Sequence, residues 1–406
     1  MSWDREQSRM LAVASISLLL SILVWFNYSA VLPLIVEEWD LSGINAGIIF
    51  GAFQAGYLIA ILPAGVFVDR YSPRWIIAIG ATTTGVASLG FAILATGFLS
   101  GTALRFVAGL GMAGVYVPGM RFVADWYAET ARGTAMGIYI GTFSLGSGLS
   151  FLISSVVASA LDWRIAIATT SVGALVVAPL ILIVGRDAPN TIQRTATGLD
   201  LTVLRNRSYL AAVSVYSWHN WELFGVRNWL IAFLLVVPAI TATRQPALVA
   251  GTLAGVMIAL GGLGNVIGGT LSDRVGRVRI ISLALLVSGL ISATIGAFQW
   301  LPLIALTALV LCYGVALTMD SAPTSTLITE LVADEHVGAA LSVQSFIGFS
   351  TTVISPVVFG WALDTGGYAL AFPTLAAGAF LALLSAALLR YTRKDKLGSA
   401  APLQES

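Results

Sequence analysis

The chain has 406 residues and a formal net charge of +1; 57% of its residues are hydrophobic and only 10% are charged. Soluble domains carry about 25% charged residues, so no soluble core accounts for this composition. The balanced charge gives no basic footprint for nucleic acid, and we expect no nucleic-acid partner. A single cysteine, Cys312, excludes a disulfide framework and a thiolate metal site.

Apolar runs of about 20 residues or more, each long enough to cross a bilayer core of about 30 Å, follow one another along the whole chain. The first run is too long for the apolar part of a signal peptide, so we interpret it as a retained helix. In chain order the runs are residues 10–34, 44–68, 75–99, 102–124, 134–160, 165–184, 209–237, 248–271, 280–298, 303–331, 339–363 and 368–389. The sequence therefore predicts an all-α membrane protein with twelve transmembrane helices.

The distribution of Lys and Arg predicts the orientation of these helices. If the N-terminus is cytoplasmic, the positive charges outside the apolar runs all fall in cytoplasmic segments, except Arg164 and Arg244. This bias is the positive-inside rule. We expect a multi-pass protein of the cell (inner) membrane with both termini in the cytoplasm.

Internal repeats divide the chain into two halves. Gly65, Asp69 and Arg70 recur 204 positions later as Gly269, Asp273 and Arg274. Several other landmarks recur at nearly the same offset: Pro33 as Pro238, Pro118 as Pro323, Gly133 as Gly338 and Asp162 as Asp364. Parallel repeats of this kind place a substrate site at their interface. We predict six-helix bundles at residues 1–185 and 209–390, a cytoplasmic linker at 186–208 and a cytoplasmic tail at 391–406.

Two loops carry a resemblance to a known family. The first reads Gly65-Val-Phe-Val-Asp69-Arg70-Tyr-Ser-Pro-Arg74, and its partner reads Gly269-Thr-Leu-Ser-Asp273-Arg274-Val-Gly-Arg277. Both resemble the loop motif of the major facilitator superfamily (MFS), although the first copy has Ser72-Pro73 where the family usually has Gly. The resemblance covers nearly the whole chain and implies the MFS fold of two pseudo-symmetric six-helix bundles.

These loops are candidates for a cytoplasmic gate. Gly65 and Gly269 allow close helix contact, and Asp69 and Asp273 stand where a helix N-terminus of the other half would accept a carboxylate. The other expected gate residues are Arg70, Arg74, Arg274 and Arg277, with Arg121 and Asp125 as a structural pair near the inner end. The alternative is a solvated loop under the positive-inside rule, which explains the arginines but not the repeated aspartates.

The fourth and fifth runs carry further family features. Arg105-Phe-Val-Ala-Gly109-Leu-Gly111 resembles the MFS motif Arg-xxx-Gly-x-Gly, which the family associates with substrate or proton handling. Arg105 could instead extend to the external interface. The fifth run is rich in glycine but lacks the glycine-proline motif usual in drug and proton antiporters, and the first run has no acidic residue. Both absences disfavour an exporter without excluding it.

The seventh run is the most polar and supplies the main candidates. A charge at a helix centre costs about 2.5 to 3.5 kcal/mol, so Glu222, Arg227 and Asp320 should face an aqueous cavity or one another. A carboxylate in a low dielectric takes up a proton more readily. We therefore expect Glu222, with His219 as a relay, to carry a coupling proton, and Arg227 to meet an anionic group of the solute. The alternative is that these charges only neutralise each other.

The tenth run carries Asp320 next to Pro323, which breaks the backbone ladder. We interpret Asp320 as a second proton site or as the partner of Arg105 or Arg227. The intramembrane charges fall on the fourth, seventh and tenth helices, which line the cavity in the family. By family analogy, the further cavity candidates are Asn27, Tyr28, Gln54, Tyr57, Tyr139, Asn265 and Gln344, each of which could equally be an interhelical hydrogen bond.

These features predict a secondary transporter that works by alternating access, and proton-coupled uptake of a small organic or inorganic anion is the leading interpretation. A proton-driven exporter of lipophilic compounds is the alternative. No Gly-xxxx-Gly-Lys-Ser/Thr loop and no His and Cys cluster is present in the sequence, so we expect neither an enzyme nor a cofactor. The expected partners are the solute, protons and the lipid bilayer, and we expect a monomer. The sequence does not identify the solute.

Overall fold

The computed structural model of the chain describes residues 4–127, 129–189, 201–333 and 337–398, and all regular structure in these ranges is helical. Within them, the side chains of residues 69, 129–130, 201, 337–339 and 391–398 are not described. The helices of the first half are α1 (Arg5–Trp39), α2 (Gly43–Arg70), α3 (Pro73–Leu94), α4 (Phe98–Trp126), α5 (Glu129–Ala160) and α6 (Trp163–Pro179), which continues as a π-helical segment, Leu180–Val184.

A short 3₁₀ helix, Leu201–Arg205, precedes the second half. The helices of this half are α7 (Arg207–Leu234), the short α8 (Pro238–Thr241), α9 (Pro246–Val275), α10 (Arg277–Ile295), α11 (Leu303–Thr318), α12 (Ser321–Glu330) and α13 (Val337–Gly398). Local sequence fixes several of the helix starts. Asp4, Ser42, Asp162 and Asn206 accept backbone hydrogen bonds at the starts of α1, α2, α6 and α7. Proline occupies the first turn of α3 and α9.

Two elements of the second half are interrupted. The predicted tenth span is broken at Met319 and Asp320 into α11 and α12, because Pro323 has no N–H to donate to the Met319 carbonyl. Helix α13 is in fact two helices, since Gly366 and Gly367 have non-helical backbone angles, with φ of 67° at Gly367.

The helices account for twelve membrane crossings. Ten helical stretches among the described residues are long and apolar enough to span a bilayer. One of them, Ala340–Arg390, contains both crossings of α13. Helix α7 is long enough but too polar to be recognised by composition, because of residues such as His219, Glu222 and Arg227. The predicted twelve-helix fold is therefore confirmed, although the tenth span is discontinuous.

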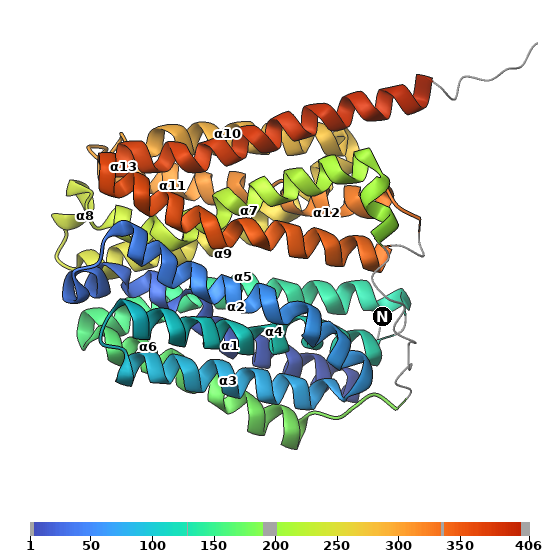
Figure 1. Cartoon of the computed structure of the whole chain (residues 1–406), viewed down its shortest axis with the longest axis horizontal. Coiled ribbons are helices and arrows are strands. Elements are labelled where there is room, and N and C mark those ends of the chain that lie inside the picture. Colours follow the sequence, from blue (N-terminus) through green and yellow to red (C-terminus); the bar gives the residue numbers. More distant parts are fainter. Residues whose placement is uncertain (1–3, 128, 190–200, 334–336, 399–406) are drawn as a thin grey trace, which may run out of the picture.

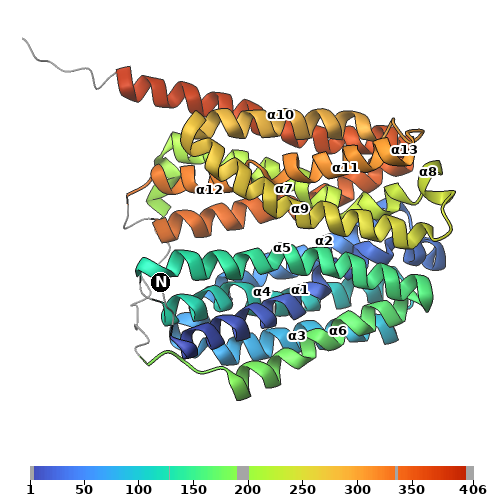
Figure 2. The ribbon, with the colours of Figure 1, turned by 180° about the vertical axis from the view of Figure 1, so that it is seen from behind.

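The two halves form two bundles side by side (Figures 1 and 2). Helices α1–α6 pack with one another, as do α7–α13, and the bundles meet mainly through α1 with α7, α2 with α13, and α5 with α9. The exact limits of the linker between them stay a prediction, because residues 190–200 lie outside the described ranges.

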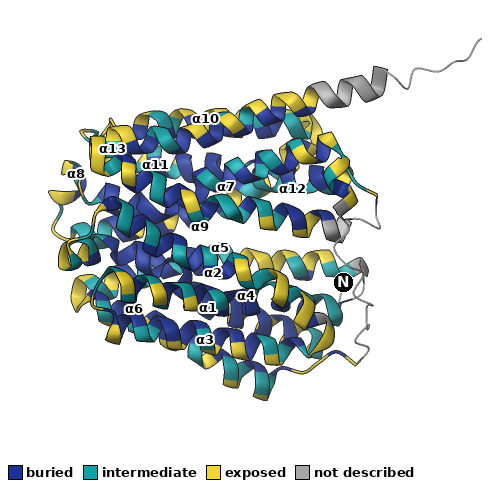
Figure 3. Ribbon diagram, in the orientation of Figure 1, coloured by how far each residue is buried: buried dark blue, intermediate teal, exposed yellow. Residues whose placement is uncertain are grey.

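The surface of the bundles is apolar. Buried residues gather along the middle of the molecule and exposed ones on its outside (Figure 3). Large apolar side chains stand fully outward, for example Leu99 and Ile183 at 80% and Ile304 at 85% exposure. Such a surface suits hydrocarbon rather than water, and helices satisfy their own backbone groups there. The chain is a multi-pass membrane protein.

Two ends of the molecule are distinguished by charge. The basic end holds the start of α1, the α2–α3 and α9–α10 loops and the residues around Arg186. The opposite end holds the α1–α2 loop, α8, Asp162 and Asp364. In Figure 1 the N-terminus marks the basic end and α8 the opposite end.

Candidate functional site

Arg227 lies where the two bundles meet. Helices α1 and α7 pack together, and Ser29 of α1 donates a hydrogen bond of 3.1 Å to Asn228 of α7. The guanidinium carbon of Arg227 is 5.5 Å from the ring centre of Phe26 and 5.8 Å from that of Phe224, within cation–π range. The residue is 6% exposed and makes no hydrogen bond or ion pair with any described residue. It is a buried cation without a counter-ion in the part of the chain that is described.

Glu222 lies inside the second bundle. Its carboxylate accepts hydrogen bonds from Ser292 at 2.6 Å and Ser288 at 2.9 Å, both on α10, and from Tyr313 on α11 at 3.4 Å. Ser292 and Tyr313 also contact each other. Glu222 and Arg227 are five residues apart, which turns their side chains about 140° from each other at 3.6 residues per turn. This spacing explains why Glu222 is bound to hydroxyl groups and not to Arg227.

A second acidic group lies at the break between α11 and α12. The Nδ1 atom of His219 is 2.9 Å from Asp320 Oδ1, and its Nε2 atom is 3.0 Å from Ser321 Oγ. Asp320 Oδ2 is buried and has no hydrogen-bond partner among the described residues. Asp320 therefore pairs with His219 and not with Arg105 or Arg227, which was one of the two interpretations from the sequence. The other interpretation, a second proton site, stays a prediction.

Arg105 lies inside the first bundle. Its guanidinium donates to the carbonyls of Val24 at 3.0 Å and Trp25 at 3.1 Å, and to the side chain of Asn27 at 3.2 Å. It also lies over the Phe53 ring, 4.4 Å from the ring centre. At 1% exposure Arg105 does not extend to the external interface. It fixes the middle of α1, whose residues Trp25 and Phe26 lie at the contact with α7.

The remaining cavity candidates fall into two groups. Asn27, Tyr28 and Tyr139 make hydrogen bonds within the first half: Asn27 donates to Thr170, Tyr28 to Ala46 and Tyr139 to Tyr116. Gln54, Tyr57, Asn265 and Gln344 each have a buried polar atom without a partner among the described residues. The second group is therefore available to a solute or to water.

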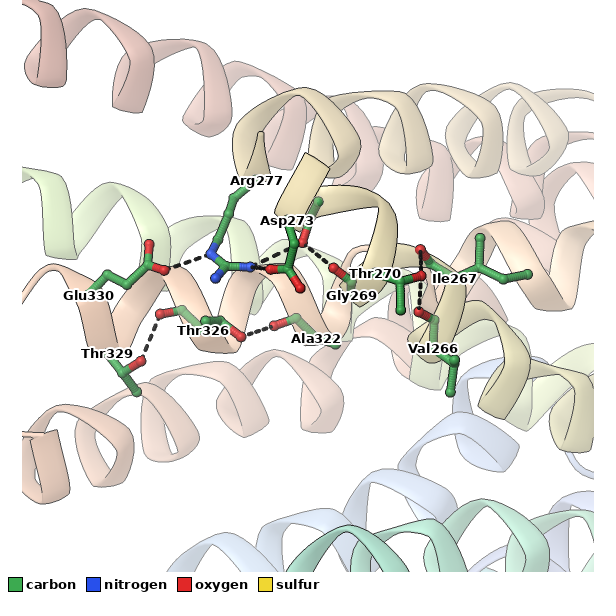
Figure 4. Close-up of polar contacts among 11 residues, drawn as sticks. Val266, Ile267, Gly269, Thr270, Asp273, Arg277, Ala322, Thr326, Thr329 and Glu330 are labelled. Carbon is green, nitrogen blue, oxygen red and sulfur yellow. Dashed lines mark hydrogen bonds and ion pairs between the residues drawn. The ribbon is translucent and has the colours of Figure 1, made fainter. Parts of the chain in front are cut away.

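The contacts found for the gate candidates join residues of the same half, and Figure 4 shows those of the second half. Arg277 bonds Asp273 at 2.9 Å and Glu330 at 2.8 Å, and Gly269 accepts a hydrogen bond from Ser272. In the first half, Arg74 donates to the Gly185 carbonyl and lies 3.8 Å from Asp187, and Arg121 pairs with Asp125 at 2.9 Å. A Cβ added to Gly65 would meet nothing within 4 Å, so the expected close helix contact is not found there among the described residues, and Arg70 and Arg274 are exposed. The side chain of Asp69 lies outside the described part.

The opposite end holds a contact between the bundles that sequence reasoning missed. The Asp364 carboxylate accepts hydrogen bonds from the backbone N–H groups of Gly43 at 2.7 Å and Ile44 at 3.1 Å, at the start of α2. Its repeat counterpart Asp162 binds the N–H of Arg164 in its own bundle. Asp364 was visible in the sequence only as a repeat landmark.

Glycines tighten the same contact. A Cβ added to Gly43 would stand 2.6 Å from the Gly360 carbonyl, and one added to Gly51 would stand 2.6 Å from the Val353 carbonyl. On α5 and α9, a Cβ added to Gly148 would stand 2.8 Å from the Gly255 carbonyl. The bundles are in direct backbone contact along the half of the molecule near the opposite end.

The basic half differs. Gly137 and Gly141 lie on the same face of α5 as Gly148, and Gly262 lies on the same face of α9 as Gly255. Added Cβ atoms at Gly137, Gly141 and Gly262 would meet nothing within 4 Å. The bundles are therefore apart where the basic halves of α5 and α9 face each other.

Grooves on the outer surface are apolar and lie away from the buried charges. One of about 620 Å³ runs between α2, α3 and α4, lined by residues such as Phe67, Trp75 and Gly111. A second, of about 420 Å³, lies between α9, α10 and α11 and includes Cys312. Because their walls offer almost no polar groups, we do not place the site there.

Comparisons with known proteins agree with this architecture. The family model of the Major Facilitator Superfamily matches residues 14–243 and 223–405. The chain is 23% identical to the hexuronate transporter of Bacillus subtilis over 391 residues, 89% of each protein, and 26% identical to a probable sulfoacetate transporter of Cupriavidus necator, covering 87% of this chain and 86% of the relative. A bacterial homologue of the lysosomal transporter Spinster, in an inward-facing and occupied conformation, has the same fold, with a TM-score of 0.80, 15% identity and coverage of 97% and 98%.

Proposed function

The chain belongs to the Major Facilitator Superfamily, and its relatives are membrane transporters and not enzymes. We propose that it takes up a small organic anion together with protons. The solute would bind between the bundles, which would expose it alternately to the two sides of the membrane. The single observation that carries the proposal is Arg227, a buried cation at the α1–α7 contact without a described counter-ion.

An unpaired buried guanidinium favours an anionic ligand. Leaving a charge without a counter-ion inside the membrane is costly, and a carboxylate offers a bidentate partner of matching geometry. The relatives named for hexuronate and sulfoacetate carry acidic solutes, which supports the same choice. Asn228, next in the chain, has an unpartnered amide nitrogen that would donate to such a group.

The proton site would be the acidic cluster of the second bundle, defined as His219, Glu222 and Asp320. With both carboxylates ionised, this cluster carries net negative charge even when His219 is protonated. A buried negative charge of this kind favours uptake of a proton. We assign the coupling proton to Glu222, with His219 and Asp320 as its relay to the α11–α12 break.

The two ends support alternating access. The bundles touch at the opposite end and stand apart at the basic end, as expected for one of the two end states. Since the positive-inside rule places the basic end in the cytoplasm, this state would be open to the cytoplasm. The two termini and the linker at 186–208 would then be cytoplasmic. The protein would lie in the inner membrane of a cell, and a single chain would suffice for transport.

The test of the anion site is uptake into proteoliposomes containing the purified protein, with a panel of carboxylates and sulfonates under an imposed proton gradient. We expect one or more anions to accumulate with the parent and with Arg244→Gln, a control at a loop arginine of the same bundle. Accumulation should fall by at least about 10-fold in Arg227→Gln, since a charged hydrogen bond contributes about 1.5 to 3 kcal/mol. If lipophilic cations are expelled instead, equally by parent and Arg227→Gln, the protein is an exporter and the proposal is wrong.

The proton assignment is tested separately. In Glu222→Gln, gradient-driven accumulation should disappear while exchange of internal for external solute continues, because exchange needs no net proton movement. Glu37→Gln, at an exposed residue near the end of α1, is the matched control and should keep both activities. Retention of gradient-driven accumulation in Glu222→Gln would contradict the assignment.

A further inference from the structure

Aromatic rings from both bundles form a continuous layer at their interface. We call this set the aromatic layer; its members are Trp25 and Phe26 of α1, Phe53 and Tyr57 of α2, Phe143 of α5, Phe224 of α7 and Phe349 of α13. Three contacts cross between the halves with ring centres 5.3 to 6.3 Å apart: Tyr57 with Phe349, Phe26 with Phe224 and Trp25 with Phe224. Phe224 and Phe349 join within the second half at 5.6 Å.

Another group of rings lies within one bundle and has a different role. Trp229, Phe233, Phe359, Tyr368 and Phe372 pack against one another in the second half only. No ring contact of this group with the first half is found among the described residues. It is bundle packing, whereas the aromatic layer lies on the surface along which the halves would separate.

The aromatic layer adjoins Arg227 directly. The guanidinium lies over Phe26 and Phe224, which are both members of the layer. A solute whose acidic group binds Arg227 would therefore place the rest of its body among these rings. Rings stack on flat groups with offset or edge-to-face geometry, and they offer no hydrogen bonds to hydroxyl groups.

Few polar groups accompany the rings. The unpartnered polar atoms on residues of the layer are Trp25 Nε1 and the Tyr57 hydroxyl. The adjacent Gln54 adds an amide, and the amide nitrogen of Asn228 would serve the acidic group. A sugar acid brings several hydroxyl groups, and each one buried without a partner carries a desolvation penalty. The surroundings of Arg227 thus suit one acidic group and a flat apolar body better than a polyhydroxylated body.

We propose that the aromatic layer and Arg227 together select a carboxylate with a flat, apolar or conjugated body over a polyhydroxylated acid of the same charge. This inference rests on the proposed anion site and narrows its substrate class. Stacking would be available to the planar body from Phe224 of one half and Trp25 or Tyr57 of the other. The solute would take the place of ring contacts between the halves.

The experiment measures equilibrium binding to the full-length protein in detergent at neutral pH, with three carboxylates of equal charge: benzoate, cyclohexanecarboxylate and glucuronate. We expect benzoate to bind tightest and glucuronate weakest. Phe349→Leu and Phe224→Leu should each weaken benzoate binding by about 2- to 12-fold, the range of one aromatic contact. The matched control, Phe372→Leu in the group confined to the second half, should leave it unchanged. Phe349 is only half-buried, so its variant keeps the test open if Phe224→Leu does not fold.

The outcomes separate this inference from the anion site itself. If glucuronate binds as tightly as benzoate or tighter, loses binding in Arg227→Gln and is unaffected by the Phe variants, the selection for flat bodies is wrong while the anion site stands. If benzoate binds but Arg227→Gln has no effect, the anion site fails and the inference fails with it. Equal weakening by Phe372→Leu would show general destabilisation, and that result also overturns the inference.

Discussion

The opposite end and the basic end of the molecule both carry small residues where the bundles face each other, but the bundles are in contact only at the opposite end. Small residues line α5 and α9 over much of their length. In the half near the opposite end they are in contact, Gly148 with Gly255 and Ser155 with Gly251. Gly141 and Gly262, toward the basic end, face open space. Small residues are needed where helices approach closely. Under the proposed alternating access, the open glycines mark a surface that would be used when the basic end closes.

Charged contacts of the described residues also cross between the halves at the opposite end and stay within one half at the basic end. At the opposite end Asp364 reaches across to α2, whereas at the basic end Asp273 binds Arg277 within its own half. The repeated aspartates of the loop motif were predicted to latch the halves together at the basic end. In this open arrangement the latch contact that is present lies at the other end of the molecule.

We expect the largest effect from Gly47→Leu. A Cβ at Gly47 would collide with the Pro356 carbonyl of α13, and a backbone carbonyl yields only if the helix moves. Overpacking of this kind costs about 1 to 3 kcal/mol, which changes the ratio of closed to open opposite ends by about 5- to 150-fold. Distances between spin labels at Leu161 and Leu370, in a Cys312→Ser background, should lengthen.

The control for this prediction is Gly137→Leu, on the open face of α5, where an added side chain meets nothing. It should leave the Leu161 to Leu370 distances unchanged. If Gly47→Leu also leaves them unchanged, the opposite end is not held closed by backbone contact.

Gly262→Leu should hinder closure of the basic end, and its effect on transport should be similar to or smaller than the effect of Gly47→Leu on the opposite end. The added side chain has room in the present arrangement, so thermal stability in detergent should stay near that of the parent. Closure of the basic end would bring the side chain against α5, so solute transport should fall by about 5-fold or more if overpacking costs 1 kcal/mol or above. Normal transport by a stable Gly262→Leu protein would show that α5 and α9 do not approach at the basic end.

Asp364→Asn should have a smaller effect on the same equilibrium. A carboxylate at an exposed helix N-terminus stabilises by about 0.3 to 1 kcal/mol, so its loss should raise the population with separated Leu161 and Leu370 labels by about 2- to 5-fold. The repeat counterpart, Asp162→Asn, removes a cap within one bundle and should leave these distances unchanged. Equal effects of the two substitutions would mean that Asp364 is a local cap and not a contact between halves.

Sequence reasoning reached the fold and the list of buried charges, because both depend on composition and position along a helix. Apolar length gave the spans, and Pro323 signalled the break that the structure has at Asp320. The polar pattern of α7 identified His219, Glu222 and Arg227 as residues needing partners, and all three are buried.

The partners themselves depend on helix rotation and on the arrangement of the halves. Pairing of His219 with Asp320 requires the relative rotation of α7 and α11–α12, which no spacing within α7 specifies. Arg105 binds carbonyl groups, which leave no trace in the sequence because every residue has one. Asp364 meets α2 of the other half, so its contact depends on how the halves are arranged and cannot be read from the repeat.

The smallest effect is expected from Arg277→Ala at the basic end. Arg277 joins Asp273, which is 64% exposed, and Glu330, which is 40% exposed. Exposed ion pairs contribute about 0.2 to 1 kcal/mol and are weakened by salt. Chemical unfolding in detergent should therefore show a loss of at most about 1 kcal/mol, and the difference from the parent should shrink in high salt. The counterpart in the first half, Arg74→Ala, loses one carbonyl contact and a longer ion pair to Asp187, so its loss should be no larger. A loss well above 1 kcal/mol that persists in high salt would show that the basic end depends on this network even while open, and the contrast between the two ends would then lie in packing alone.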